Sequence, residues 1–379
     1  MNSNDRLRLL GSLDLVKQCL ATWSVDDTSF SLTAGALTPL SQDFLFAQPS
    51  TLNLLLQEDT LPERSTLTFT LRCGTAYTSV VVKTNGAPVP GSLVVDPMEG
   101  TAIDTLFSFS GKDWTDDPDG YPLTYRFGFI SDSNKNPLSL VRLSQQSYGS
   151  AKLPAGSTIR DYQVPCVLTV YDTLTASATV EIPALVRPTT AERETELLTQ
   201  LAEETEANGN FDSKRNLIAT IAATLNKPNC TVASNCMAMG RQGCLRKSFT
   251  CGPCLQGYSG ILADSNTPCT WTNTSSNPTN ASTPTAAYRE EQKTCPNDCS
   301  DNGACYLQDK STSKLLTSCR LEDTQCEGKC RCSNGYTGLG CELSPDQRKT
   351  NQLLRSRAVK TLDDSSLRPE FGSYYITMT

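Results

Sequence analysis

The chain has 379 residues, which is room for about two or three domains. Its formal charge of -7 includes no basic run that would suit a nucleic acid or an anionic lipid, so we expect neither as a partner. An apolar share of 38% is low for one large core and favours small β-domains and disulfide-rich modules. No run of about 18 apolar residues occurs, so we expect no membrane-spanning helix in this chain.

The first half of the chain is patterned as β-strands. Apolar and polar residues alternate over 67–73 and 123–129, as on strands with one buried face. Turn signals separate such runs, and a Pro- and Gly-rich stretch at 84–91 marks a divide. Short strands at this spacing predict a mainly β fold with two sandwiches of the immunoglobulin or fibronectin-III type, over 1–86 and 87–188.

The segment 189–228 is patterned as a helical hairpin. Thr189 and Glu192 predict a capping box for the first helix, which Gly209 ends. Asp212 predicts the N-cap of the second helix. Because so short a loop makes two helices antiparallel neighbours, we expect a spacer packed on an adjoining domain.

The 17 cysteines are concentrated in the last part of the chain. Three are scattered before residue 229, and fourteen follow between Cys230 and Cys341. Dense cysteines in small loop-rich stretches indicate disulfides and an oxidising compartment. A cytosolic zinc protein is the alternative, but the chain has no histidine and only one C-x2-C knuckle, at Cys251 and Cys254.

The last eight cysteines are spaced C-x3-C-x5-C-x13-C-x6-C-x3-C-x-C-x8-C. The closing run Cys330-x-Cys332-Ser-Asn-Gly-Tyr-Thr-Gly-Leu-Gly-Cys341 and the run Asp301-Asn-Gly-Ala-Cys305 resemble an epidermal-growth-factor-like (EGF-like) module over 295–343. Modules of that family pair their six cysteines first to third, second to fourth and fifth to sixth. The resemblance therefore implies the bonds Cys295–Cys305, Cys299–Cys330 and Cys332–Cys341, with Cys319 and Cys326 paired inside an insertion.

Six more cysteines lie in the segment 229–269, namely Cys230, Cys236, Cys244, Cys251, Cys254 and Cys269. The run resembles a laminin- or EGF-related cysteine repeat, and its pairing stays open. Cys251-Gly-Pro-Cys254 is identical to the redox motif of thioredoxin-like oxidoreductases, but the Gly-rich sequence after it does not start a helix. Permanent disulfides are favoured over a redox site. A Ser/Thr/Pro-rich linker, 270–294, follows.

The cysteines of the first half are few. Cys19 and Cys73 both fall on the apolar side of their strands, so we expect a disulfide across two sheets, as in immunoglobulin domains. Cys166 is then left over as a buried free thiol or as the partner of a cysteine outside this chain.

A second resemblance rests on three runs. They are Leu93-Val-Val-Asp-Pro97, Gly100-Thr-Ala-x-x-Thr105-x-Phe107 and Trp114-x-Asp-Asp-Pro-Asp-Gly-x-Pro122-Leu-x-Tyr-x-Phe127. These are similar to the receptor-for-egg-jelly (REJ) module that sea-urchin sperm receptors share with the polycystin family. The resemblance covers residues 12 to 228 and implies an ectodomain whose tryptophan, leucine and tyrosine fill a sandwich core.

Aspartates crowd the loop that follows Trp114. Asp116, Asp117 and Asp119 have a spacing that can ligate calcium. The alternative is a solvated turn whose carboxylates accept hydrogen bonds from backbone amides. The residues before Cys295 do not match the calcium-binding EGF-like pattern, so we expect no metal there.

Three sequons, at Asn229, Asn273 and Asn280, are candidate N-glycosylation sites. The two in the 270–294 linker are exposed in any fold. Without histidine, no Ser-His-Asp or Cys-His site can form, and we expect neither enzymatic activity nor a cofactor. The tail 344–379 shows only a possible short helix near 352–359.

These features predict an extracellular adhesion, recognition or structural segment of a larger cell-surface protein, with a protein or glycan as its partner. The N-terminus is not a signal peptide, so we expect a fragment of a longer exported chain. Two alternatives remain at this point. One is a secreted matrix or ciliary filament component, and the other is a thiol–disulfide oxidoreductase that uses Cys251 and Cys254.

Overall fold

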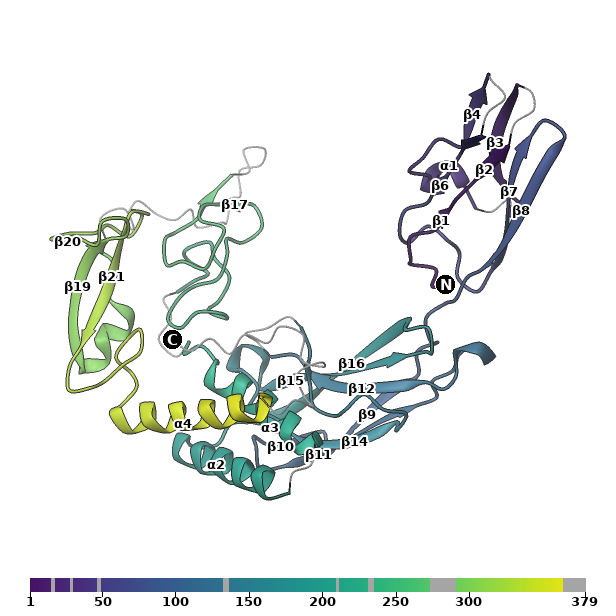
Figure 1. Ribbon diagram of the computed structural model, residues 1–379. Coiled ribbons are helices and arrows are strands. Elements are labelled where there is room, and N and C mark those ends of the chain that lie inside the picture. The colour runs from purple at the N-terminus through teal and green to yellow at the C-terminus, as the bar shows by residue number, and fades with distance from the viewer. Residues whose placement is uncertain are drawn as a thin grey trace, which may run out of the picture.

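The computed structural model describes residues 1–14, 18–27, 30–45, 49–131, 136–208, 211–230, 235–272 and 291–363. Over these residues the protein is mainly β, which confirms the predicted fold class. It comprises two β-sandwiches, a group of helices and two disulfide-rich modules (Figure 1).

The first sandwich has one four-stranded sheet and a thinner second layer. The sheet has the order β4 (Ser41–Phe44), β3 (Cys19–Val25), β7 (Thr66–Cys73), β8 (Ala76–Lys83). Opposite it lie the pairs β2 (Ser12–Asp14) with β5 (Pro49–Thr51) and β1 (Arg8–Leu9) with β6 (Leu54–Leu55), and the short helix α1 (Leu32–Gly35). Trp23 is buried between the layers, where its Nε1 donates to the carbonyl oxygen of Leu52 at 2.8 Å.

The second sandwich is larger. Its five-stranded sheet has the order β10 (Glu99–Thr101), β16 (Ser177–Arg187), β15 (Gln163–Tyr171), β12 (Thr124–Phe129), β13 (Leu138–Ser139). The facing sheet has the order β14 (Tyr148–Lys152), β11 (Leu106–Lys112), β9 (Ser92–Asp96), and two 3-10 turns, η1 (Pro118–Gly120) and η2 (Thr158–Arg160), lie in the loops. Strand alternation brings Phe109 and Phe127 from opposite sheets together, with ring centroids 6.0 Å apart.

The helical hairpin consists of α2 (Ala191–Asn208) and α3 (Phe211–Leu225). Its apolar residues, such as Leu197 and Leu217, are buried in the same core as the second sandwich. Both predicted caps are wrong in position. The hydroxyl that accepts from the Arg193 amide, at 3.3 Å, belongs to Thr190 and not to Thr189, because a cap lies three residues before that amide. The second helix begins at Phe211, so Asp212 lies inside its first turn.

A third long helix, α4 (Pro345–Leu362), follows the cysteine modules and extends well beyond the short helix predicted at 352–359. Ser344 and Gln347 form a reciprocal capping box at its start. The helix packs against α2 and α3, and Leu354 and Ala358 join their core (Figure 1). Both cysteine modules are therefore inserted between two helices that contact each other. None of the helices over the described residues is long and apolar enough to cross a membrane.

The two cysteine modules have little regular structure. The first contains β17 (Tyr258–Ser259) and β18 (Thr270–Trp271). The second contains the 3-10 segment η4 (Pro296–Asp301) and a sheet in the order β20 (Leu315–Leu316), β19 (Gly303–Asp309), β21 (Cys326–Cys332). Their small cores consist largely of cysteine side chains, so disulfides replace the apolar core that such short segments lack.

Candidate functional site

The acidic loop lies at the joint between the two sandwiches. Arg64, which precedes β7, has its Nη2 3.3 Å from Oδ1 of Asp116 and its Nε 3.3 Å from Oδ2 of Asp117. The Asp116 side chain is fully buried, and that of Arg64 is about one third exposed. Arg64 also donates to the carbonyl oxygen of Ala87, so one guanidinium binds both the segment that connects the sandwiches and the acidic loop of the second sandwich.

Asp119 is bound in the same way. Lys83, at the end of β8, has its Nζ 2.6 Å from Oδ2 of Asp119. This hydrogen bond holds the pKa of Asp119 below its usual value and raises the pKa of Lys83. Each of the three calcium candidates thus faces a cationic side chain of the first sandwich. This favours ion pairs between the sandwiches over a calcium site in the loop.

A polar cluster completes the joint. Asn2 donates from Nδ2 to the carbonyl oxygen of Leu174 at 2.8 Å. Asn85 donates to the side chains of Asn2 and of Asp172, which is buried. The other carboxylate oxygen of Asp172 accepts from two backbone amides, those of Leu174 and Ala176. No motif or periodicity marks Arg64, Lys83 or Asn85 as joint residues, because their partners Asp116, Asp119 and Asp172 belong to the other sandwich.

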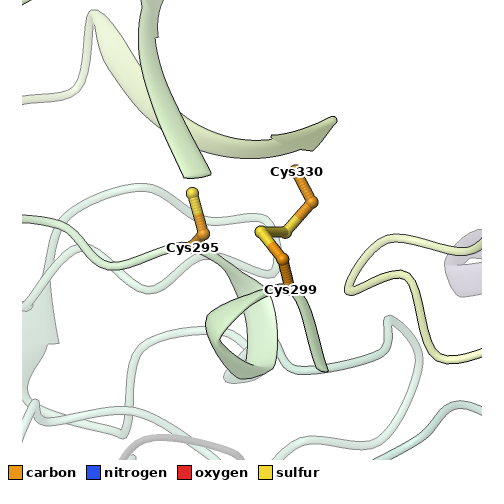
Figure 2. A group of neighbouring side chains, drawn as sticks. All are labelled: Cys295, Cys299 and Cys330. Atoms are coloured by element: carbon orange, nitrogen blue, oxygen red, sulfur yellow. A yellow bond between two sulfur atoms is a disulfide. The ribbon is translucent and has the colours of Figure 1, made fainter. Parts of the chain in front are cut away.

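The C-terminal module is built around a group of sulfur atoms. Those of Cys295, Cys299 and Cys330 all lie within 4.8 Å of one another (Figure 2). Cys299 is bonded to Cys330 and Cys295 to Cys305, so these sulfurs are not available as thiolate ligands for a metal. The remaining bonds of the module are Cys332–Cys341 and Cys319–Cys326.

A left-handed turn lies beside these disulfides. Asn297, Asp298, Cys299 and Ser300 have φ values of 46°, 44°, 58° and 51°. Such a conformation costs about 1 kcal/mol or more for each residue with a side chain. The Cys295–Cys305 bond lies just before the turn and the Cys299–Cys330 bond lies within it, so cross-links hold the chain in this conformation.

The first cysteine module has two disulfides whose loops overlap and a third whose loop follows them. The bonds are Cys230–Cys244, Cys236–Cys251 and Cys254–Cys269. The two cysteines of the Cys-Gly-Pro-Cys run are thus bonded to different partners and do not form a dithiol pair with each other. A redox site would need them to exchange electrons as a pair, so this arrangement is a structural one.

Arg241 organises the same module. Its side chain is fully buried, and its guanidinium donates to the carbonyl oxygens of Thr267, Gly252, Ile261 and Ala263. Burial lowers the pKa of Arg241 from its ordinary value. A planar group with five donors can satisfy several loop carbonyls at once, and short loops have few other donors to offer.

The predicted bond between the two sheets of the first sandwich is wrong in its location. Cys19 and Cys73 are bonded, with Cα atoms 5.6 Å apart, but they lie on β3 and β7, which are neighbours in one sheet. The register that pairs Ala21 with Cys73 places Cys19 diagonally opposite, within reach of a disulfide. The layer facing them offers only two-residue and three-residue strands.

Cys166 is free and lies in the core of the second sandwich. Burial raises the pKa of its thiol to about 12, so the thiolate does not form at physiological pH. Among the sequons, Asn229 lies just before the first module, and its backbone N–H donates to the Ser248 hydroxyl oxygen at 2.9 Å. Asn273 and Asn280 lie outside the described residues.

The model of one protein family, described as the REJ domain, matches residues 1–220. This is more than half of the 379 residues. The chain belongs to the REJ domain family. The REJ match covers both sandwiches, the joint and α2, and it ends within α3, before the cysteine modules.

Several solved structures with immunoglobulin-like or adhesin descriptions are similar to this REJ chain at low identity. Titin domains A168–A170 are 11% identical over 49% of this chain and 60% of that one, with a TM-score of 0.26. The Yersinia pseudotuberculosis adhesin InvE is 12% identical over 48% of this chain and 55% of the adhesin chain, with a TM-score of 0.18. The N-terminal four Ig domains of Dscam1 are 10% identical over 50% of this chain and 42% of the Dscam1 chain, with a TM-score of 0.16.

The REJ part also carries an open groove of about 620 Å³ on the outer face of the β14-β11-β9 sheet. Ser108 and Ser110 line it from β11, and α3 contributes Asp212 and Asn216. Tyr148 is largely exposed beside them. The lining offers hydroxyl, amide and carboxylate groups together with exposed apolar side chains, which suits a partner that makes both hydrogen bonds and apolar contacts.

Proposed function

We propose that this chain is an extracellular adhesion or recognition segment of a larger, polycystin-like cell-surface protein. Two observations together carry the proposal. The REJ family model matches residues 1–220, and all fourteen cysteines between Cys230 and Cys341 are paired in disulfides. Stable disulfides in loop-rich modules belong to oxidising compartments.

We also infer that residues 295–343 are an EGF-like module with an insertion. The bonds Cys295–Cys305, Cys299–Cys330 and Cys332–Cys341 follow the first-to-third, second-to-fourth and fifth-to-sixth order of such modules. The Cys319–Cys326 bond lies within the extra segment between the third and fourth positions. Such a module adds length and a stiff surface to an ectodomain without any metal.

The partner in this proposal is a protein or a glycan, held in the groove of the second sandwich. The groove is lined by residues of the second sandwich and of the helical hairpin, so its shape is set within this one packed unit. Hydroxyl and amide groups recognise either kind of partner through hydrogen bonds, and Tyr148 adds a ring for stacking.

The test is a binding assay with the whole secreted chain displayed on beads and offered to a panel of cells. We expect binding that falls when Tyr148→Ala and Ser110→Lys are introduced together, while Leu37→Ala, which removes an exposed apolar side chain on the first sandwich, leaves it unchanged. Protease treatment of the cells removes binding if the partner is a protein, and glycosidase treatment removes it if the partner is a glycan. Absence of binding to every cell type contradicts the proposal.

The secreted-matrix alternative makes a different prediction, namely that the chain is incorporated into insoluble material and does not require cells. The oxidoreductase alternative predicts insulin reduction that depends on Cys251. We expect no such activity, because Cys251 is buried and bonded to Cys236.

A further inference from the structure

β8 is a sheet edge without the usual protection. It is the last strand of the four-stranded sheet, and its pairing with β7 is uninterrupted from Ala76 to Lys83. Natural edge strands are normally shortened, bulged, or marked with proline or charged residues, because an open edge recruits other strands. β8 contains no proline, and its single charged residue is the terminal Lys83.

The other edge strands over the described residues differ from β8. β4, β10 and β13 have four, three and two residues. β14 has five residues and contains Gly149, and β9 has five residues and ends in the charged Asp96. β21 has seven, but three of them are charged, namely Glu327, Lys329 and Arg331. β8, with eight residues, is thus the longest edge and the least protected one among these.

The turn before β8 shows which backbone groups face outward. Gly74 has φ of 62° and opens a two-residue loop, so Cys73 and Ala76 flank the turn as a hydrogen-bonded pair. Hydrogen-bonded and non-bonded pairs alternate along an antiparallel ladder, so Tyr77, Ser79 and Val81 direct their N–H and C=O groups away from β7. The Ser79 and Thr70 hydroxyls, 2.9 Å apart, fit a closely spaced non-bonded pair.

The side chains on this edge are apolar and exposed. Tyr77 and Val81 are 67% and 62% exposed, on the face of the sheet that is turned away from the core, and Val80 is 40% exposed on the other face. The strand therefore offers a strip that has unpaired backbone groups and no charge between Ala76 and Val82.

We propose that β8 pairs with β8 of a second copy of this chain, antiparallel about a two-fold axis at Ser79. Because opposite residues of paired strands must point to the same face, Ser79 then faces the partner's Ser79 and Tyr77 faces the partner's Val81. Tyr77, Ser79 and Val81 of each copy exchange backbone hydrogen bonds, and the two sheets become one eight-stranded sheet. An aromatic ring beside a β-branched residue is a favourable cross-strand pair.

Self-pairing is favoured because the strip is uncharged and meets its own copy without electrostatic repulsion. No like charges meet near the axis, since Lys83 is at the end of the strand and is bound to Asp119 of its own chain. The chain leaves β8 towards the joint, so the antiparallel arrangement directs the two second sandwiches in opposite directions and leaves the edge clear. This proposal rests on the geometry of β8 and does not depend on the proposed function.

The test is sedimentation velocity of the whole secreted chain over a range of concentrations. We expect a monomer–dimer equilibrium. Ser79→Pro removes one outward N–H, and Ser79→Lys places two ammonium groups opposite each other, so each should weaken dimerisation on the order of tenfold or more. Leu20→Lys is the matched control, because Leu20 is also exposed on the outer face of this sheet but lies on the interior strand β3. It should leave the dimer intact.

The register is tested by cross-linking. Tyr77→Cys with Val81→Cys in one chain should give a covalent dimer under mild oxidation, whereas Tyr77→Cys alone should not, since the two Tyr77 residues are far apart along the paired strands. Four outcomes overturn the proposal: a wild-type monomer at about 100 µM, a dimer insensitive to both Ser79 variants, equal disruption by Leu20→Lys, or equal cross-linking by the single variant. If Ser79→Pro does not fold, Ser79→Lys decides.

Discussion

The guanidinium of Arg64 in the first sandwich is bound to the fully buried carboxylate of Asp116 in the second, with Nη2 3.3 Å from Oδ1. The two residues are 52 positions apart in the chain. A buried carboxylate is stable only with a hydrogen-bonded cation or donor close to it, so the second sandwich depends on the first for this partner. The joint is therefore part of the folding of both sandwiches.

Replacement of Arg64 by Ala should destabilise the joint. The Asp116 carboxylate would stay buried without its cation, which we expect to cost about 2 kcal/mol of the free energy of unfolding. Urea unfolding measures this loss, and small-angle scattering measures the broader range of angles between the sandwiches. Arg64→Lys should recover only part of the stability, because a single ammonium group cannot bind both carboxylates and the Ala87 carbonyl oxygen as the guanidinium does.

Lys83→Ala is the matched control for that experiment. The Lys83 and Asp119 side chains are 72% and 77% exposed, so water replaces their interaction easily. We expect no measurable change in unfolding. If Lys83→Ala lowered the free energy of unfolding as much as Arg64→Ala does, burial of Asp116 would not be the reason for the larger contribution expected of Arg64.

Arg241→Lys should impair formation of the first cysteine module. Lysine cannot supply the fork of donors that reaches the carbonyls of Gly252, Ile261 and Ala263, and each buried carbonyl left unpaired costs about 1 to 3 kcal/mol. We expect less secreted protein and mixed pairing within residues 230–269 by peptide mass spectrometry. Arg246→Lys, which alters a more exposed pair with Asp264, should secrete normally. Normal pairing in Arg241→Lys would refute the assigned role.

Asp298→Gly should stabilise the C-terminal module. Asp298 is exposed and has φ of 44°, a conformation that glycine adopts without a steric penalty, so we expect a gain of about 1 kcal/mol. Slower hydrogen exchange of the β19 and β21 amides would report it. Asp346→Gly, in the right-handed first turn of α4, should have the opposite sign. A loss of protection in Asp298→Gly would show that its carboxylate matters more than its backbone.

The buried thiol of Cys166 should make the free energy of unfolding depend on pH. Burial raises the pKa of its thiol to about 12 from an ordinary 9.0. Between these values the unfolded chain releases the proton and the folded chain keeps it, so the stability that is present below pH 9.0 falls as the pH rises towards 12. The slope is about 1.4 kcal/mol per pH unit. Comparison of urea midpoints at two pH values, one below and one within this window, should show a smaller decrease in Cys166→Ala than in the wild type.

Thiol labelling checks the same residue directly. Iodoacetamide at neutral pH should leave Cys166 unmodified in the folded protein and label it after denaturation, because the thiol is neutral and buried. Rapid labelling of the native chain would contradict this and would also remove the basis for the pH dependence.

The sequence by itself determined the local features of this protein. Alternation over 67–73 and 123–129 marked strands because side chains of a strand point to opposite faces in turn. The tertiary structure decided the rest. It placed Arg64 on Asp116, put Cys19 and Cys73 in one sheet, docked the polar helix α4 through Leu354, and left β8 at an edge. These outcomes depend on which surfaces meet, and periodicity and spacing do not reveal that, because they describe only residues that are close in the chain.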